Sequence, residues 1–255
     1  MLKIILKVID ILRIDISLLR FFKIRPRSVA SLKILMRLQK DVPHLESIID
    51  AGANIGQFAR AASIAYSGAK IFSIEPDPNT VKKIKDNLSD LKQVQIYQTA
   101  IGIHRGVTNF YRNEYSQASS ILPLANNDEG LLSEKRKTEI MQVPITTLDD
   151  LFSDKKLKHP ILLKMDLQGF EHQALQGAER LLNSIDYILS ETVFTRSYED
   201  EALFNEISMY LERRNFYFVR PMAFVENSKG HIVQMDCLFQ RSNNVPDEHL
   251  NLYSS

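Results

Sequence analysis

The sequence predicts an α/β protein with a doubly wound, mostly parallel sheet of seven strands that ends in an antiparallel hairpin. Two observations predict this class. Through most of the chain, short apolar runs alternate with segments of helical periodicity, as in repeated strand–helix–strand units. Near the end, two strand-like runs flank the turn-forming residues 227–230, which predicts a hairpin. A helical extension, residues 1–45, precedes the first strand, so we expect the main domain to span residues 46–255.

Composition excludes several classes of protein. The chain has 255 residues, 44% apolar and 25% charged, which suits one sizeable globular domain with a small appendage. Its net charge of +1 leaves no electrostatic footprint for nucleic acid. The single cysteine, Cys237, forbids an internal disulfide and favours a reducing, cytoplasmic location. Because Cys237 lies in an apolar run, we expect it to be a buried strand residue.

The first 24 residues are apolar but carry a narrow polar stripe. Its members recur every three or four residues: Lys3, Lys7, Asp10, Arg13, Ser17 and Arg20. A charge in nearly every turn argues against a transmembrane span, and no cleavage site of a secretory signal follows. Two interpretations stay open. The helix packs on the domain or on a second subunit of a homo-oligomer, or it lies on a membrane surface as a peripheral contact.

The first half of the main domain alternates strands and helices. The predicted strands are residues 47–50, 70–74 and 94–98, and the predicted helices are residues 55–66 and 77–88. Asp77 is placed as the N-cap of the second helix, with Pro78 at its first position.

An insertion of about residues 106–147 then interrupts this alternation. It contains strand-like residues 107–111 and 141–147, with a polar loop at 126–137 between them. Afterwards the predicted strands are residues 161–165, 187–189, 216–219, 223–226 and 232–239, and the predicted helices are residues 170–182 and 202–214.

The segment from Ile48 to Gly56 is the most informative one. A strand ends in Asp50, a tight turn carries Gly52, and a helix starts near Gly56. Glycine suits a turn that approaches a ligand closely, and the helix start offers free N–H groups. The spacing D-x-G-x-x-x-G departs from the G-x-G-x-x-G of dinucleotide enzymes, which cradles a pyrophosphate. S-adenosylmethionine has no phosphate, and its ammonium and carboxylate suit an acid beside exposed N–H groups.

A second acid ends the next strand. Glu75 follows Gly52 by 23 residues, close to the spacing of about 20 that places an acid on ribose hydroxyls. The two signals together predict an adenosyl ligand.

Several segments, in order, resemble the FkbM-type methyltransferase family. They are DAGANIGQF from residue 50, IEPDP from residue 74, VPITTLDD from residue 143, LKMDLQGFE from residue 163 and ALQGA from residue 174. The resemblance runs from about residue 48 to residue 240. It implies a Rossmann-like class I methyltransferase domain, S-adenosylmethionine as the cofactor, and O-methylation of a hydroxyl on a sugar, glycan or small metabolite.

The resemblance also implies a division of the cofactor site. It assigns the methionine end to Asp50, Gly52, Ala53, Asn54 and Gly56, the ribose to Glu75 with Pro76, and the adenine side to Thr99 and Ala100. In one place this chain departs from the family, because Gln168 stands where the fourth-strand motif usually has an acid. The departure leaves the role of position 168 open.

Asp166 is the leading candidate for the residue that contacts the methyl acceptor, and we also expect it to border the cofactor. It ends a predicted parallel strand, where open α/β sheets bind ligands. Asp166 serves as a general base, as a hydrogen-bond acceptor or as half of a metal site. Glu171, Glu191 and His231 are further catalytic candidates, as is His172. Since no spaced His/Asp cluster accompanies them, we assign no metal ligands, and a divalent cation is an unsupported alternative.

Other side chains are candidates for shaping the acceptor pocket. They are Ser119 and Ser120 in a polar loop, and Arg196 and Tyr198 after the fifth predicted strand.

Three other functions compete with O-methylation. The first is methylation of nitrogen or carbon on another small molecule. The second is a nicotinamide-dependent oxidoreductase, against which the glycine spacing argues. The third is a non-catalytic relative that keeps the fold as a binding module, against which the retained Glu75 and Asp166 argue.

Overall fold

The large sheet of the protein has seven strands in the order β3-β2-β1-β7-β8-β10-β9. The structure, a computed structural model, describes residues 28–114, 116–125 and 138–242. The strands are β1 (Ser47–Ala51), β2 (Lys70–Ile74), β3 (Val94–Tyr97), β7 (Ile161–Met165), β8 (Tyr187–Val193), β9 (Phe216–Glu226) and β10 (Ile232–Arg241). From β3 to β8 all pairs are parallel, whereas β10 runs antiparallel to both β8 and β9. The predicted fold class, with its terminal hairpin, is confirmed.

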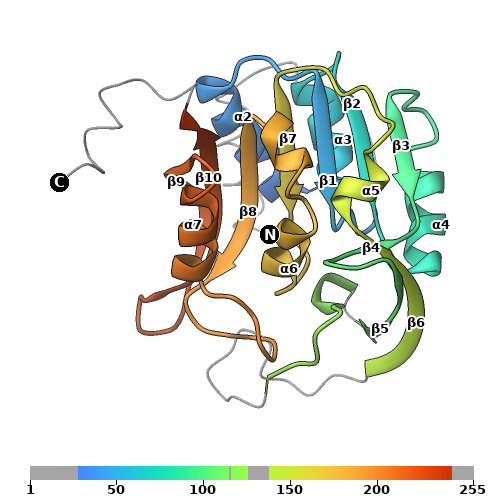
Figure 1. Cartoon of the computed structure of the whole chain (residues 1–255), viewed down its shortest axis with the longest axis vertical. Coiled ribbons are helices and arrows are strands. Elements are labelled where there is room, and N and C mark those ends of the chain that lie inside the picture. Colours follow the sequence, from blue (N-terminus) through green and yellow to red (C-terminus); the bar gives the residue numbers. More distant parts are fainter. Residues whose placement is uncertain (1–27, 115, 126–137, 243–255) are drawn as a thin grey trace, which may run out of the picture.

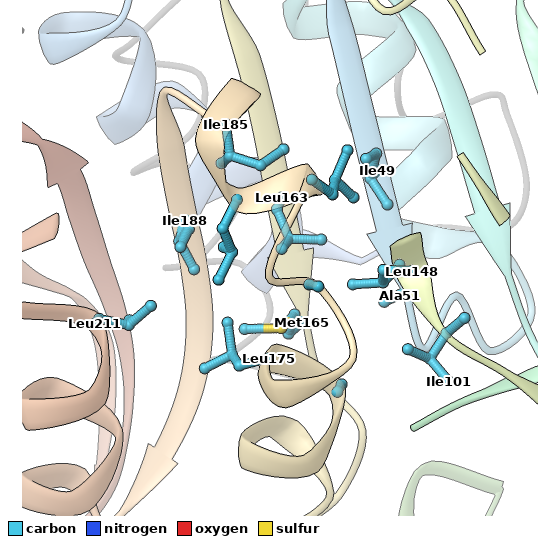
Figure 2. Packing of buried hydrophobic residues seen from close by; sticks show 14 of the residues in the cluster. Ile49, Ala51, Ile101, Leu148, Leu163, Met165, Leu175, Ile185, Ile188 and Leu211 are labelled. Carbon is cyan, nitrogen blue, oxygen red and sulfur yellow. The ribbon is translucent and has the colours of Figure 1, made fainter. Parts of the chain in front are cut away.

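Helices cover both faces of this sheet (Figure 1). They are α2 (Val29–Asp41), α3 (Gln57–Ala65), α4 (Pro78–Asn87), α5 (Leu148–Leu151), α6 (Glu171–Gln176) and α7 (Phe204–Glu212), with the 3₁₀ turns η2 (Ser116–Ala118) and η3 (Leu181–Ser184). Because successive strand side chains point to opposite faces, neighbours in β1 enter different cores. Ile48 belongs to a core that includes residues of α2, α3 and α4, whereas Ile49 belongs to a core that includes residues of α5, α6 and α7. Figure 2 shows this second core, in which Met165 of β7 lies beside Leu175 of α6.

The helical extension is described from residue 28 onward. Ser28 caps α2 by accepting a hydrogen bond from the Ser31 amide at 3.0 Å, and Leu35 and Leu38 bury the helix against the sheet. Residues 1–24, with their polar stripe, lie outside the described residues, so both interpretations of them stay predictions. Among the helices that the structure describes, none is long and apolar enough to span a bilayer.

A second, smaller sheet occupies the predicted insertion. It consists of β4 (Ala100–Ile101), β5 (Gly106–Asn113) and β6 (Thr138–Thr146) in the order β4-β6-β5. The two predicted strands of the insertion are present, and the short β4 is an addition that pairs parallel to β6. Figure 1 places this sheet at the end toward which β1 and β8 point. Residues 126–137, the predicted polar loop, lie outside the described residues.

The predicted helix at 170–182 is wrong in its second half. α6 ends at Gln176, and a turn precedes the 3₁₀ segment η3. A Cβ at Gly177 would lie 2.0 Å from the carbonyl oxygen of Gly102, so the backbone after β4 packs directly on this glycine. Such a close contact between two chain segments does not show in the helical periodicity.

Three predicted strands also need correction. β8 continues to Val193 instead of ending at residue 189, because β10 pairs with it along its whole length. The two strands predicted at 216–219 and 223–226 are one strand, β9, which passes through Pro221. β9 is the edge of the sheet, where proline is tolerated, and its register shifts near this residue. Cys237 is fully buried in β10, as predicted.

Candidate active site

A cavity of about 540 Å³ lies at the carboxyl ends of the parallel strands. The turns after β1, β2 and β7 form its floor, and the small sheet and the first turns of α2 form walls. Most of the residues predicted for the cofactor line it: Gly52, Ala53, Asn54, Glu75, Pro76, Thr99, Ala100 and Asp166. The chain thus brings these residues together from four separate segments. Asp50 and Gly56, the other two residues predicted for the cofactor, do not line the cavity.

The turn after β1 needs its glycines for two physical reasons. Gly52 and Gly56 have φ angles of +79° and +89°, which other residues rarely adopt. In addition, a Cβ at Gly52 would lie 1.8 Å from the backbone oxygen of Asp166. The turns after β1 and β7 therefore touch backbone to backbone, which draws the two halves of the cavity together.

Asp50 supports this turn through a lysine that sequence reasoning missed. Asp50 is fully buried, and Lys164 in β7 places its Nζ 3.1 Å from the Asp50 Oδ1. The same ammonium donates to the Gly52 carbonyl at 3.0 Å. Burial opposes the charge of Lys164, but the neighbouring Asp50 and Asp166 raise its pKa above the usual value. A lysine inside an otherwise apolar central strand was the available signal.

Glu75 enters the cavity from the end of β2. Its carboxylate accepts hydrogen bonds from the backbone amides of Asn54, at 3.0 Å, and Asp77, at 3.1 Å. Burial raises its pKa to about 7, against these two hydrogen bonds. The Asn54 side chain accepts from the Ser116 hydroxyl at 3.1 Å, which ties the turn to the insertion. Backbone groups thus hold Glu75 in position, and its ionised form is available to a ligand with hydroxyl donors.

The small sheet is also attached to the large one by charge. Asp77 caps α4 as predicted and accepts from the amide of Asn79 at 3.0 Å. Arg112 in β5 donates to both carboxylate oxygens of Asp77, at 3.0 and 3.2 Å. Although burial opposes its ionisation, these contacts lower the pKa of Asp77. This link holds the insertion over the half of the cavity above β1 and β2.

The other half of the cavity, above β7, β8 and β10, is lined with acids. Asp166, Glu191 and Asp236 all face it, and Asp236 was not anticipated from the sequence. Gln168 donates from its side-chain nitrogen to Asp166 Oδ1 at 2.7 Å and to Glu191 Oε2 at 2.9 Å. Gln234 donates to the other oxygen of Glu191. Burial, followed by the charge of Asp166, raises the pKa of Glu191 well above its usual value and that of Asp236 to about 7.

Ser119, proposed to shape the acceptor pocket, lines the cavity, whereas the catalytic candidates Glu171, His172 and His231 do not. Glu171 is buried and accepts from the Leu167 amide at 2.5 Å, and burial raises its pKa to about 8. His172 packs edge-on against Tyr210, with ring centroids 5.0 Å apart. His231 is exposed in the turn between β9 and β10. Among the described residues, no group of three or more His, Cys, Asp or Glu side chains is arranged to hold a metal ion.

The sequence that builds most of this site matches a known protein family. Residues 50–218 match the FkbM methyltransferase domain. The chain belongs to the FkbM methyltransferase family. The FkbM match includes the turn after β1, Glu75 and the motif that carries Asp166 and Gln168. It does not include α2 or β10, so Gln234 and Asp236 come from outside the matched domain.

Curated relatives of this FkbM methyltransferase include enzymes of similar length. The chain is 27% identical over 182 residues to the 2-O-methyltransferase NoeI of Sinorhizobium fredii, covering 68% of this chain and 70% of that protein. It is 24% identical over 158 residues to the hexuronic acid methyltransferase AglP of Haloferax volcanii, covering 62% of this chain and 60% of AglP. The chain therefore spans less than two thirds of AglP.

Solved methyltransferase structures resemble it more distantly. The magnesium protoporphyrin IX methyltransferase of Synechocystis PCC 6803, solved with SAH, matches with a TM-score of 0.46 at 10% identity, covering 83% of this chain and 81% of that one. Human N-acetylserotonin methyltransferase, solved with SAM, matches with a TM-score of 0.42 at 14% identity, covering 84% and 52%.

Proposed function

We propose that this methyltransferase transfers the methyl group of S-adenosylmethionine to a hydroxyl of a sugar. The observation that carries the proposal is one cavity in which Glu75 and Asp166 stand on either side of the turn at Gly52. Membership of the FkbM family supports the reaction. The names of the relatives NoeI and AglP support an oxygen atom and a sugar as the acceptor.

The half of the cavity above β1 and β2 fits the proposed donor. Glu75 can accept hydrogen bonds from two neighbouring ribose hydroxyls. The turn at Gly52 lets a ligand approach the backbone closely, because glycine adds no side chain there. Thr99 and Ala100 line the side assigned to the adenine. When bound, S-adenosylmethionine supplies a methyl group on a positively charged sulfur, a charge that a cavity rich in carboxylates accommodates.

Asp166 is the group proposed to act on the acceptor hydroxyl. Its side chain is 39% exposed and lines the cavity, unlike the buried Glu171. From this position its carboxylate can orient a hydroxyl and take its proton as the new C–O bond forms and the bond between the methyl carbon and the donor sulfur breaks. Such a base contributes roughly 10²- to 10⁴-fold to the rate. Glu191 borders the same space, but its carboxylate is held by the side chains of Gln168 and Gln234, and burial raises its pKa, which disfavours the ionised form that a base requires.

The negative charge of the acids above β7, β8 and β10 favours some sugars over others as the acceptor. Asp166, Glu191 and Asp236 face the acceptor half, and Lys164 is the sole basic side chain among the described residues that line the cavity. Lys164 is already engaged by Asp50. An acceptor carboxylate would therefore lie near several acids without a free cation, which is unfavourable in a desolvated site. The proposed acceptor is a sugar without a carboxylate, in contrast to the hexuronic acid in the name of AglP.

Two measurements test the proposed function. Calorimetric titration with S-adenosylmethionine, S-adenosylhomocysteine and NAD should give saturable binding for the first two and none for NAD. A panel of neutral, amino and uronic acid glycosides, incubated with the protein and S-adenosylmethionine, should yield methylated neutral or amino sugars. Absence of binding to both adenosyl compounds would refute the methyl-transfer proposal. Methylation confined to uronic acids would refute the proposed acceptor class alone.

A further inference from the structure

We propose that Gln168 is a positioning residue whose amide bridges Asp166 and Glu191 in the place that a divalent cation takes between two carboxylates. The proposal rests on the proposed function only in treating this half of the cavity as the acceptor side. It gives a role to Gln168, which the sequence left open.

The geometry shows a bridge between the two acids. The Gln168 side-chain nitrogen lies 2.7 Å from Asp166 Oδ1 and 2.9 Å from Glu191 Oε2. A primary amide has two N–H donors, so one can be directed at each carboxylate. With both donors used, the amide links the end of β7 to β8.

Neighbouring groups hold the amide in this orientation. The Tyr198 hydroxyl donates to the Gln168 side-chain oxygen at 2.9 Å, which turns the nitrogen toward the acids. The Ser120 hydroxyl donates to the Gln168 backbone oxygen at 2.6 Å. Gln168 has a φ angle of +54° and Gly169 one of +93°. A glutamine with positive φ is uncommon, and surrounding contacts must compensate for such a conformation.

The bridge reduces the electrostatic repulsion between Asp166 and Glu191. Two partly buried carboxylates that approach the same point repel each other, and proteins relieve this repulsion with a shared proton, a cation or hydrogen-bond donors. Gln168 supplies donors without adding charge. An acid at this position would place a third carboxyl group between the other two and would require a proton or a cation. In this chain, therefore, the pair stays aligned without a divalent cation.

The bridge also directs Asp166. Its Oδ1 accepts from Gln168, while its Oδ2 lies 3.8 Å from the ammonium of Lys164, beyond hydrogen-bond distance. The second oxygen is therefore the one available to an acceptor hydroxyl. Gln168 acts on the reaction through Asp166.

Mn²⁺ titration of the full-length protein, without donor and followed by electron paramagnetic resonance, tests the bridge. Wild type should show no saturable binding at this site. Gln168→Glu should bind one Mn²⁺ per chain, at least about tenfold more tightly than the detection limit that wild type sets, because a third oxygen ligand replaces the two N–H donors. Adding Asp166→Asn to that variant should remove the gain. Gln142→Glu on the exposed face of β6 is the matched control and should behave as wild type.

Gln168→Met is a second variant that tests the bridge if Gln168→Glu does not fold. It removes both donors at similar length, so it should bind Mn²⁺ more tightly than wild type and more weakly than Gln168→Glu. The proposal is overturned if wild type binds one Mn²⁺ that Asp166→Asn abolishes, since a cation would then belong to this pair. It is also overturned if neither variant binds Mn²⁺ more tightly than wild type. S-adenosylhomocysteine affinity, measured separately, reports on the proposed function.

Discussion

The two halves of the cavity are built by different means. Above β1 and β2, backbone groups set the geometry, since Glu75 is held by the amides of Asn54 and Asp77 and the turn depends on the φ angle of Gly52. Above β7, β8 and β10, side chains hold one another, as Gln168 and Gln234 do with Glu191. A short motif can therefore specify the first half, whereas the second half depends on residues far apart in the chain.

The largest expected effect separates the two halves by function. Asp166→Asn should lower the rate of methyl transfer roughly 10²- to 10⁴-fold, because the amide cannot take the proton of the acceptor hydroxyl. Affinity for S-adenosylhomocysteine, measured by calorimetry, should stay close to that of wild type. Equal loss of donor binding and of rate would contradict the division into two halves.

Gly52→Ala should disturb the contact between the halves. The new Cβ would meet the backbone oxygen of Asp166, and alanine would have to adopt a φ near +79°. Both costs together amount to about 3 kcal/mol or more. Urea denaturation should show this loss, and the soluble variant should bind S-adenosylhomocysteine weakly. Gly230→Ala, in the open turn before β10, has a similar φ but no atom within 4 Å of a new Cβ, and it should lose less stability.

Glu75 should make donor binding depend on pH. Its pKa is raised to about 7, and its ionised form is the one that accepts from ribose hydroxyls. S-adenosylhomocysteine should therefore bind about tenfold more tightly at pH 8 than at pH 6, since the ionised fraction rises through this range. Glu75→Gln should bind weakly with no such dependence. Asp236→Asn, which removes the other acid with a pKa of about 7, should keep it; if this control loses the dependence instead, Glu75 is not its source.

The smallest effect is expected at His231. This residue is exposed in the β9–β10 turn and does not line the cavity. His231→Ala should change the rate of methyl transfer by less than about twofold, as is usual for exposed positions. A large loss of rate in a steady-state assay would mean that this turn reaches the acceptor.

Local sequence was sufficient to predict which residues form the half of the cavity above β1 and β2. The run from Asp50 to Gly56 and the acid at Glu75 are close to one another in the chain, and strand–turn–helix units place such residues at one edge of a parallel sheet. The alternating strands and helices, the cap at Asp77 and the buried Cys237 were predictable for the same reason, because periodicity and capping are local properties.

Long-range packing decided the rest. Lys164 reaches Asp50 and Gly52 because β7 inserts beside β1, and Asp236 joins Asp166 because β10 pairs with β8. The break after α6 and the continuation of β8 likewise depend on segments that pack from elsewhere in the chain. Residue spacing along the chain does not predict such contacts. Hydrogen bonds and ion pairs depend on distances in space, and assembly of the sheet sets those distances.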